Sequence, residues 1–296
     1  MNFLLRMAIP TSRSLLSAFL GLVFATGLLA QTAPKLEFPQ ASPPATIKQR
    51  VGLTDITIEY SRPSVRNRVI FGGLVPYGQV WRTGANTATK ISFSAPVKLN
   101  GTPIAAGTYE LFTIPGQDEW TIIIHKDTSE WGAYTYDAKN DIARFTTKPT
   151  SFPVNSESMT FGFNDLRDTT ATMYLIWAKT RVPISVEVDT VATLVPQIKA
   201  AMAAEGKKPY FPAAMFYYEN NIDLKQAVEW MDAAIALQPK AYYMVYRKGL
   251  ILAKMGDKAG AIAAAEASIA LAKADKDSPV KDEYLHLNEA LIASQR

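Results

Sequence analysis

Apolar and polar residues alternate in short runs between residues 47 and 190. These runs are rich in Ile, Val, Thr, Phe and Tyr, and clusters of Gly, Pro, Asn or Asp separate them, as is typical of β-strands joined by turns. No helical pattern intervenes, so the sequence predicts an antiparallel β-sandwich or open barrel over this range. The runs are DITIEYS, KISFSAPVKL, GTYELFTIP, WTIIIHK, SMTFGFNDL, TATMYLIWAK and PISVEV.

Two local patterns refine this prediction. Asn100 and Gly101 separate two strand-like runs, and both residue types tolerate a positive φ, so a tight hairpin is expected there. In TYELFTI, Leu111 falls on one face of the strand, and Phe112 and Ile114 fall on the other. We therefore expect this strand to be buried on both sides over part of its length.

The spacing of apolar residues changes after Val188, where alanine becomes frequent and apolar residues recur every three or four positions. DLKQAVEWMDAAIAL, from Asp223, matches DKAGAIAAAEASIAL, from Asp257, at an offset of 34 residues. That period belongs to tetratricopeptide repeats. Small residues at the matching positions would let paired helices approach closely: Ala227, Ala234, Ala261, Ala265, Ser268 and, on the helix between, Gly249.

The two patterns together predict an α+β, multi-domain chain. A β-domain over residues 47–190 precedes a tetratricopeptide-like helical domain over residues 191–296. Two repeats are fewer than such units need to stand alone. We therefore expect the helices to pack against the β-domain or a partner.

The N-terminus has the pattern of an export signal. Arg6 and Arg13 precede the apolar run LLSAFLGLVFATGLLA, which ends near Ala30. Residues 1–30 are therefore predicted to be a cleaved signal peptide, with an uncleaved anchor as the alternative. A proline-rich leader follows over residues 31–46. The expected location is the periplasm or the extracellular space.

Composition limits the classes of partner and chemistry. The chain has no cysteine, which excludes disulfides, thiolate chemistry and a lipid-anchoring cysteine. Its formal charge of +4 includes Arg6 and Arg13, so the mature protein carries only about +2. We therefore do not expect nucleic acid as a partner. No second apolar run of membrane-spanning length occurs, so no membrane span is expected after signal cleavage.

Three segments within residues 42–190 resemble a known family of secreted bacterial proteins. They are YSRPSVRNRVIFGGLVPYGQVWRTGANTATKI, AAGTYELFTIPGQDEWTIIIHKD and WGAYTYDAKNDIARF. The family is a domain of unknown function (catalogue number 2911), found largely in Bacteroidetes and their relatives. The resemblance implies an envelope or secreted location and a mostly-β domain, often with a helical tail. It implies no activity, so no catalytic residue is carried over. At the position of Thr87 similar sequences often have glutamate, and this chain departs from them there.

The first of these segments is also the best candidate for a ligand site. Guanidinium groups bind carboxylates and phosphates, and tryptophan faces stack on sugar rings and cations. This combination suits an anionic or saccharide ligand. The alternative is structural: the arginines pair with acids of the same domain, such as Asp137, Asp141 and Asp165, while Trp81 packs in the core. The predicted ligand-binding residues are Arg62, Arg66, Arg68, Trp81, Arg82 and Asn86.

Other motifs carry weaker signals. The only histidines, His125 and His286, fall in different domains and cannot form a typical zinc site, so no metal or cofactor is predicted. His125 is interpreted as a strand-end residue, because no serine motif accompanies it. The aromatics of WGAYTYD, which include Trp131 and Tyr134, could extend a sugar-stacking platform or form a packed edge of the sandwich.

The helical domain should present a concave surface, which in such repeats usually binds peptides or proteins. Aromatic residues beyond those needed for a core indicate a partner surface that includes Tyr217, Tyr218, Tyr243 and Arg247. The leading hypothesis is a secreted or periplasmic, non-enzymatic binding protein. The alternatives are an envelope or polysaccharide hydrolase with unidentified acidic catalytic residues, and a purely structural envelope protein.

Overall fold

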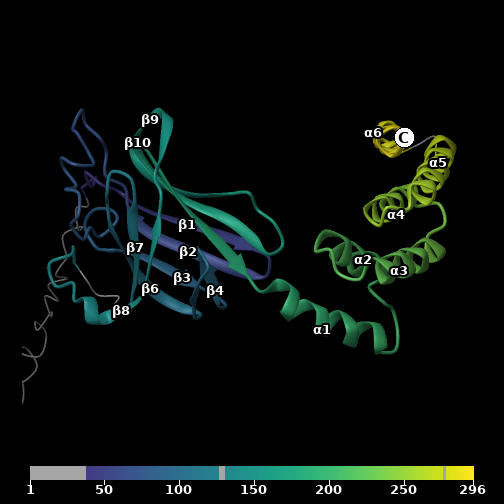
Figure 1. The fold of residues 1–296 in the computed structure, drawn as a ribbon, viewed down its shortest axis with the longest axis horizontal. Coiled ribbons are helices and arrows are strands. Elements are labelled where there is room, and N and C mark those ends of the chain that lie inside the picture. The colour runs from purple at the N-terminus through teal and green to yellow at the C-terminus, as the bar shows by residue number, and fades with distance from the viewer. Residues whose placement is uncertain (1–37, 127–130, 276–277) are drawn as a thin grey trace, which may run out of the picture. The chain divides into compact units, whose positions relative to one another are not determined.

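The computed structural model describes residues 38–126, 131–275 and 278–296 (Figure 1). The predicted signal peptide lies outside these residues. Within them, ten strands form two antiparallel sheets, and six helices follow. The predicted α+β class is therefore confirmed. No helix of this described part is long and apolar enough to cross a membrane.

The larger sheet has six strands in the order β1-β2-β3-β6-β7-β8. Its first strand begins at Pro44, inside the segment predicted to be leader, so the ordered domain starts earlier than expected. Proline is tolerated there because β1 is an edge strand and Pro44 is its first residue. The strands are Pro44–Val51 (β1), Thr54–Ser61 (β2), Thr89–Phe93 (β3), Gly107–Ile114 (β6), Trp120–His125 (β7) and Asp141–Thr147 (β8).

The smaller sheet has four strands in the order β5-β4-β10-β9. The predicted hairpin joins β4 to β5, with Leu99 paired to Thr102 and φ values of 45° at Asn100 and 79° at Gly101. These left-handed conformations explain why asparagine and glycine occupy the turn. The strands are Val97–Leu99 (β4), Thr102–Ile104 (β5), Thr150–Asn164 (β9) and Thr170–Val188 (β10).

Both sheets contribute side chains to one apolar core. Ile58 and Ile91 enter it from the six-stranded sheet, and Leu99, Met173 and Val186 enter it from the four-stranded sheet; all are nearly or fully buried. This shared core makes the β-domain a two-layer sandwich, held chiefly by the burial of apolar surface.

Strand β6 is buried on both faces, as its pattern predicts. Leu111 belongs to the main core, whereas Phe112 forms a second small cluster with Ala88 and Ile123 on the opposite face of the sheet. Tyr136, from the segment between β7 and β8, packs against this second cluster. The segment between β7 and β8 therefore covers part of the outer face of the larger sheet.

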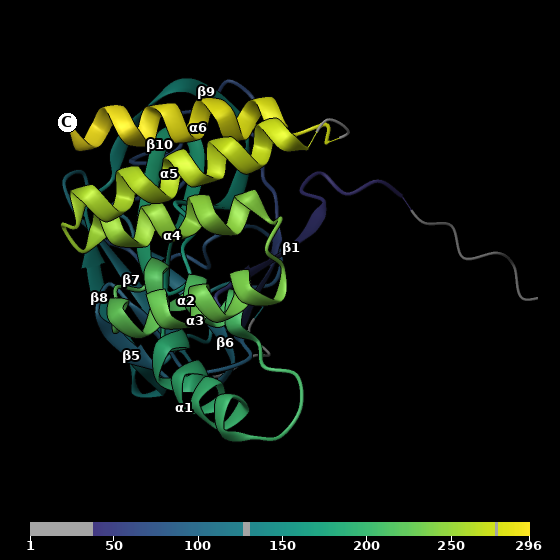
Figure 2. The same ribbon diagram turned by 90° about the vertical axis from the view of Figure 1, so that its right-hand side faces the viewer.

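Consecutive helices from α2 to α6 pack as antiparallel hairpins, and α4, α5 and α6 run side by side (Figure 2). Asp223 and Asp257, 34 residues apart, begin α3 and α5 in the same way: each carboxylate accepts a backbone N–H three residues on. The helices are Thr190–Ala203 (α1), Tyr210–Glu219 (α2), Leu224–Leu237 (α3), Tyr242–Lys254 (α4), Lys258–Ala274 (α5) and Lys281–Gln295 (α6).

Candidate functional site

The arginine-rich segment is the long connection between β2 and β3, residues 62–88. Four of its non-glycine residues have positive φ: Arg66 (47°), Asn67 (58°), Thr83 (54°) and Asn86 (58°). Such conformations are costly and persist only where surrounding contacts fix them. The backbone of the connection is therefore held in a specific, non-extended conformation at these residues.

Trp81 lies in the core, as the structural alternative expected. Its backbone N–H donates to the carbonyl of Thr113 at 2.8 Å and its carbonyl accepts the Thr113 N–H at 2.9 Å, so this point of the connection extends the sheet beside β6. Its ring packs against Phe71, Trp120 and Trp177. The side chain is 9 % exposed and its Nε1–H donates to the Gly84 carbonyl at 3.1 Å.

Two of the predicted arginines donate hydrogen bonds from their guanidinium groups to backbone carbonyls. Nε of Arg62 donates to the carbonyl of Met159 on β9 at 2.9 Å, and its Nη2 donates to the Thr160 hydroxyl at 2.6 Å. Arg68 donates from Nε to the Val65 carbonyl at 3.0 Å and from Nη2 to the Ser64 carbonyl at 2.6 Å. Both side chains are therefore engaged in shaping the connection.

Arg66 and Asn86 also contact nearby chain. The backbone N–H of Arg66 donates to the Glu157 carboxylate at 2.9 Å, and its Nη2 makes a long contact of 3.4 Å with the Ala41 carbonyl. The Asn86 amide donates to the Ser61 hydroxyl at 3.2 Å. In the part of the chain that the structure describes, none of the four arginines forms an ion pair, and Asp141 pairs instead with Arg144.

Arg82 differs from the other three. Its guanidinium makes no hydrogen bond with the described residues, although its Nε is buried. Thr83, the next residue, donates to the Thr113 hydroxyl on the core side at 3.1 Å, so alternation places Arg82 on the outer side of the sheet. There its Nη1 lies 3.6 Å from the position that a Cβ on Gly132 would take. Burying a cationic donor without an acceptor costs free energy. An anionic ligand that accepted a hydrogen bond from Arg82 would offset that cost.

A pocket of about 290 Å³ opens at the same connection. Arg68, Gln79, Trp81, Arg82 and Trp177 line it, and its described lining includes no aspartate or glutamate. Nε1–H of Trp177 is buried and has no acceptor in the described part of the chain. The described lining of the pocket therefore includes two arginines and no carboxylate.

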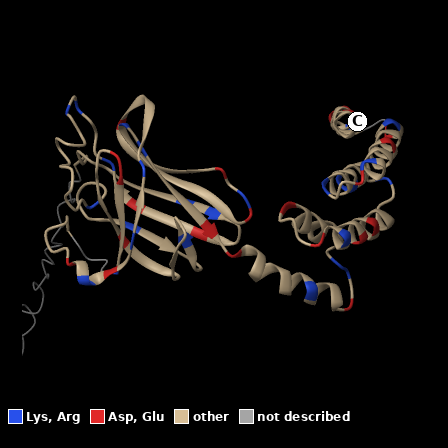
Figure 3. Ribbon diagram, in the orientation of Figure 1, with Lys and Arg blue, Asp and Glu red and all other residues tan. Residues whose placement is uncertain are grey.

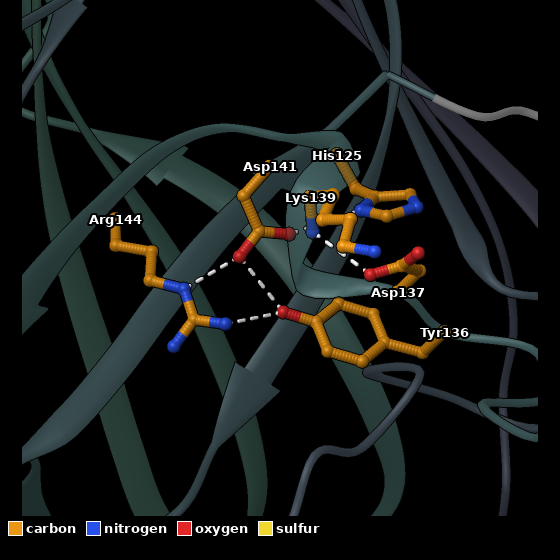
Figure 4. A network of polar contacts seen from close by, with 6 residues as sticks. All are labelled: His125, Tyr136, Asp137, Lys139, Asp141 and Arg144. Carbon is orange, nitrogen blue, oxygen red and sulfur yellow. Dashed lines mark hydrogen bonds and ion pairs between the residues drawn. The ribbon is translucent and has the colours of Figure 1, made fainter.

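A polar network around the buried side chains of His125 and Asp141 lies on the outer face of the six-stranded sheet (Figure 4). Nδ1 of His125 lies 3.0 Å from Oδ1 of Asp141. Tyr136 donates to Oδ2 of Asp141 at 2.8 Å, Arg144 donates to the same atom from Nε at 2.5 Å, and Nη2 of Arg144 donates to the Tyr136 hydroxyl at 2.5 Å. The network joins the end of β7 to β8 and to the segment between them.

The network determines the charge of its members. Burial alone would raise the pKa of Asp141, but hydrogen bonds from His125, Tyr136 and Arg144 hold that pKa below its ordinary value. Burial and the hydrogen bond to Asp141 raise the pKa of Tyr136 to about 12. Asp141 is therefore a carboxylate and Tyr136 a neutral donor across the physiological range.

The same face carries a row of ionisable residues. Lys90, Glu110, His125 and Asp141 are direct cross-strand neighbours on β3, β6, β7 and β8, so their side chains share one face. His125 and Glu110 are fully buried, and Nε2 of His125 has no partner in the described residues. An imidazole oriented by a carboxylate, with its other nitrogen free, can accept a proton or a hydrogen bond from a bound group.

Sequence reasoning placed His125 at a strand end, where β7 does end, but missed its partner. Under the structural alternative, Asp141 was expected to pair with an arginine of the connection. The alternation in TYELFTI and WTIIIHK does put Glu110 and His125 on the face of Phe112, but Asp141 lies outside both runs, so neither pattern shows that it meets His125. No cluster of three or more His, Cys, Asp or Glu residues that could hold a metal ion occurs among the described residues.

The predicted partner surface of the helical domain is not one exposed patch. Tyr217 is 3 % exposed and packs against Trp230, so it is a core residue of the domain. Tyr218, Tyr243 and Arg247 are half-buried. The hypothesis of a protein partner stays a prediction, but Tyr217 cannot belong to the exposed surface of this fold.

Comparison with known families matches residues 42–186 to a family described as protein of unknown function (DUF2911). No curated protein and no solved structure matches the chain. The match covers the β-domain, including the arginine-rich connection and the buried network.

Proposed function

Residues 42–186 belong to the DUF2911 family, whose function is unknown, and we propose that this chain is an exported, non-enzymatic binding protein whose β-domain holds a small anionic ligand at Arg82. One observation carries the proposal. Arg82 lines a pocket, its Nε is buried, and its guanidinium has no acceptor among the described residues. A ligand anion would supply that acceptor.

The chemistry of the pocket supports an anion with a planar or tetrahedral oxygen group. Guanidinium binds carboxylate and phosphate through two parallel hydrogen bonds, and charge-assisted bonds of this kind are about twice as strong as neutral ones. Gln79, a neutral hydrogen-bonding residue, also belongs to the lining. A volume of about 290 Å³ is at the lower end for ligand pockets, so a small acid fits better than a large one.

The overall charge supports a single anionic group rather than a polyanion. Basic and acidic residues are interspersed along the strands and helices of the described chain (Figure 3). Proteins that bind nucleic acid through its backbone gather basic residues on one face. Recognition here would therefore be local, at Arg82 and its pocket.

A thermal-shift experiment on residues 31–296 tests the proposal. Galacturonate, acetate, inorganic phosphate and a nucleoside monophosphate are the probes. An anion at a hundredfold excess over its dissociation constant should add about 2.7 kcal/mol to the free energy of unfolding. Arg82→Ala should remain folded and lose this shift, because its guanidinium holds no backbone group.

Arg50→Ala is the matched control, since Arg50 lies on β1, away from the pocket, and its contact with Asp55 is long at 4.0 Å. This variant removes one positive charge and should keep the wild-type shift. An equal shift in wild type and Arg82→Ala would refute the assignment of the site. So would a failure of every anion to stabilise the wild type.

A further inference from the structure

Two aromatic rings stand exposed beside Arg82. Trp131 is 66 % exposed and Tyr134 is 80 % exposed, the highest values among the tryptophans and tyrosines of the described chain. Their ring centroids lie 6.1 Å apart and their planes differ by 20°. Their planes are therefore nearly parallel, and much of each ring is exposed to solvent.

The backbone holds these rings in place. Trp131 forms an antiparallel bridge with Thr87, in the arginine-rich connection. Gly132 has a φ of +82°, and a Cβ there would lie 2.7 Å from Cε2 of Tyr134, so only glycine allows this ring to rest on the chain. Both rings are thus positioned by local structure, although neither is needed in the core.

Arg82 connects the rings to the pocket. Its Nη1 would lie 3.6 Å from a Cβ at Gly132, the residue that follows Trp131, and Arg82 also lines the pocket. An aromatic surface is therefore next to a guanidinium that lacks an acceptor among the described residues.

We propose that Trp131 and Tyr134 form a stacking platform for an acidic saccharide, whose sugar ring packs on the aromatic faces while its carboxylate binds Arg82. This inference rests on the proposed function and specifies the class of its ligand. Apolar C–H faces of sugars pack on aromatic rings, and the guanidinium selects an acid over a neutral sugar.

The size of the platform favours a saccharide over a protein. Two rings exposed to this degree leave on the order of 300 Å² of surface, whereas a stable protein interface buries roughly 800 Å² on each partner. The platform matches a ligand of one or two sugar rings.

Titration with tetragalacturonate, followed by tryptophan fluorescence and by calorimetry, tests this inference. Trp131 is the most exposed tryptophan, so stacking on it should change the long-wavelength emission of the wild type. Trp131→Ala and Tyr134→Ala should each weaken binding about threefold to tenfold. Trp131→Phe keeps an aromatic face and should bind nearly as well as the wild type. Because both side chains are exposed, the alanine variants should keep the wild-type melting temperature.

The methyl ester of the same tetrasaccharide separates stacking on the platform from carboxylate binding at Arg82, because it keeps the sugar rings and removes the charge. The inference predicts weaker binding of the ester and of Arg82→Ala. Equal binding of acid and ester, lost in Trp131→Ala alone, would contradict both the acidic class of saccharide and the anion site at Arg82. If Trp131→Ala binds tetragalacturonate like the wild type, the platform is refuted. If the wild type does not bind tetragalacturonate while simple anions still stabilise it through Arg82, the platform fails and the proposed function stands.

Discussion

Arg62 and Arg82 occur in one connection and are chemically identical, yet the structure uses them differently. Arg62 donates to Met159, which is 97 residues away in the sequence, whereas Arg82 has no acceptor in the described chain. Which carbonyl faces which arginine depends on how β9 packs beside the connection. The sequence could therefore identify the arginine-rich segment as the candidate site, but not which arginine is free to bind.

The buried network gives a pH dependence to stability at the level of single residues. The pKa of Tyr136 is about 12 in the folded protein and about 10 in an unfolded chain. A raised pKa stabilises the fold fully below pH 10, and this contribution is lost as the pH rises from 10 to 12. Tyr136→Phe should therefore flatten the loss of stability in that window, by at most about 2 kcal/mol. Urea unfolding of both proteins at pH 8, 10.5 and 11.5 measures this difference. If the free energies of unfolding of the two proteins fall in parallel with pH, the raised pKa of Tyr136 in the network is contradicted.

Asp141 gives the free energy of unfolding a pH dependence of the opposite sign, at low pH. Its folded pKa lies below the unfolded value of about 4, so its contribution is present above pH 4 and is lost as the pH falls through the folded pKa. Asp141→Asn should be less stable than the wild type at pH 7, because His125, Tyr136 and Arg144 lose their charged acceptor. Its stability should also change less between pH 4 and pH 2. Equal acid sensitivity of the two proteins would exclude this role.

At the level of elements, periodicity predicted the strands and the helical repeat well because burial imposes it. It failed at β1, which none of the predicted runs covers, and at the start of β9, where TSFPVNSES shows no clean alternation. This strand lies at the edge of the smaller sheet, so Pro153 needs no inward hydrogen bond and many of its side chains face solvent. Hydrophobic pattern carries little information where a strand has no buried face.

The repeat makes a specific prediction at Gly249 in α4. A Cβ there would lie 3.0 Å from Cδ2 of Leu291 and 3.3 Å from the Ala261 carbonyl, so glycine allows α4 to approach α5 and α6 closely. Gly249→Val should destabilise the protein by about 1–3 kcal/mol through overpacking. Gly249→Ala should cost less, because its gain in helix propensity of about 1 kcal/mol offsets the tighter contact. Thermal unfolding by circular dichroism measures both, and a valine variant as stable as the wild type would show that these helices are not so close.

At the level of the whole molecule, sequence pattern predicted the two-sheet domain and the helices that follow it. It could not predict the buried row of ionisable residues, because cross-strand register decides which polar side chains meet. The proposed export is a property of the whole chain. We expect the intact mass of protein recovered from the periplasm or medium of an expressing bacterium to correspond to residues 31–296. A mass that retains residues 1–30 would instead support an uncleaved anchor.

The proposal that Arg82 is the anion-binding residue can be tested most directly at its own Nε–H. A ¹H–¹⁵N spectrum of the arginine side chains, with the Arg82 signal assigned from an Arg82→Lys variant, should be recorded during titration with galacturonate and then with phosphate. We predict that one of these anions shifts the Arg82 Nε–H signal in a saturable manner and that galactose does not. The signals of Arg62 and Arg68 should stay in place, because their Nε–H groups already donate to the Met159 and Val65 carbonyls. An Arg82 signal that does not move with either anion would contradict the proposal.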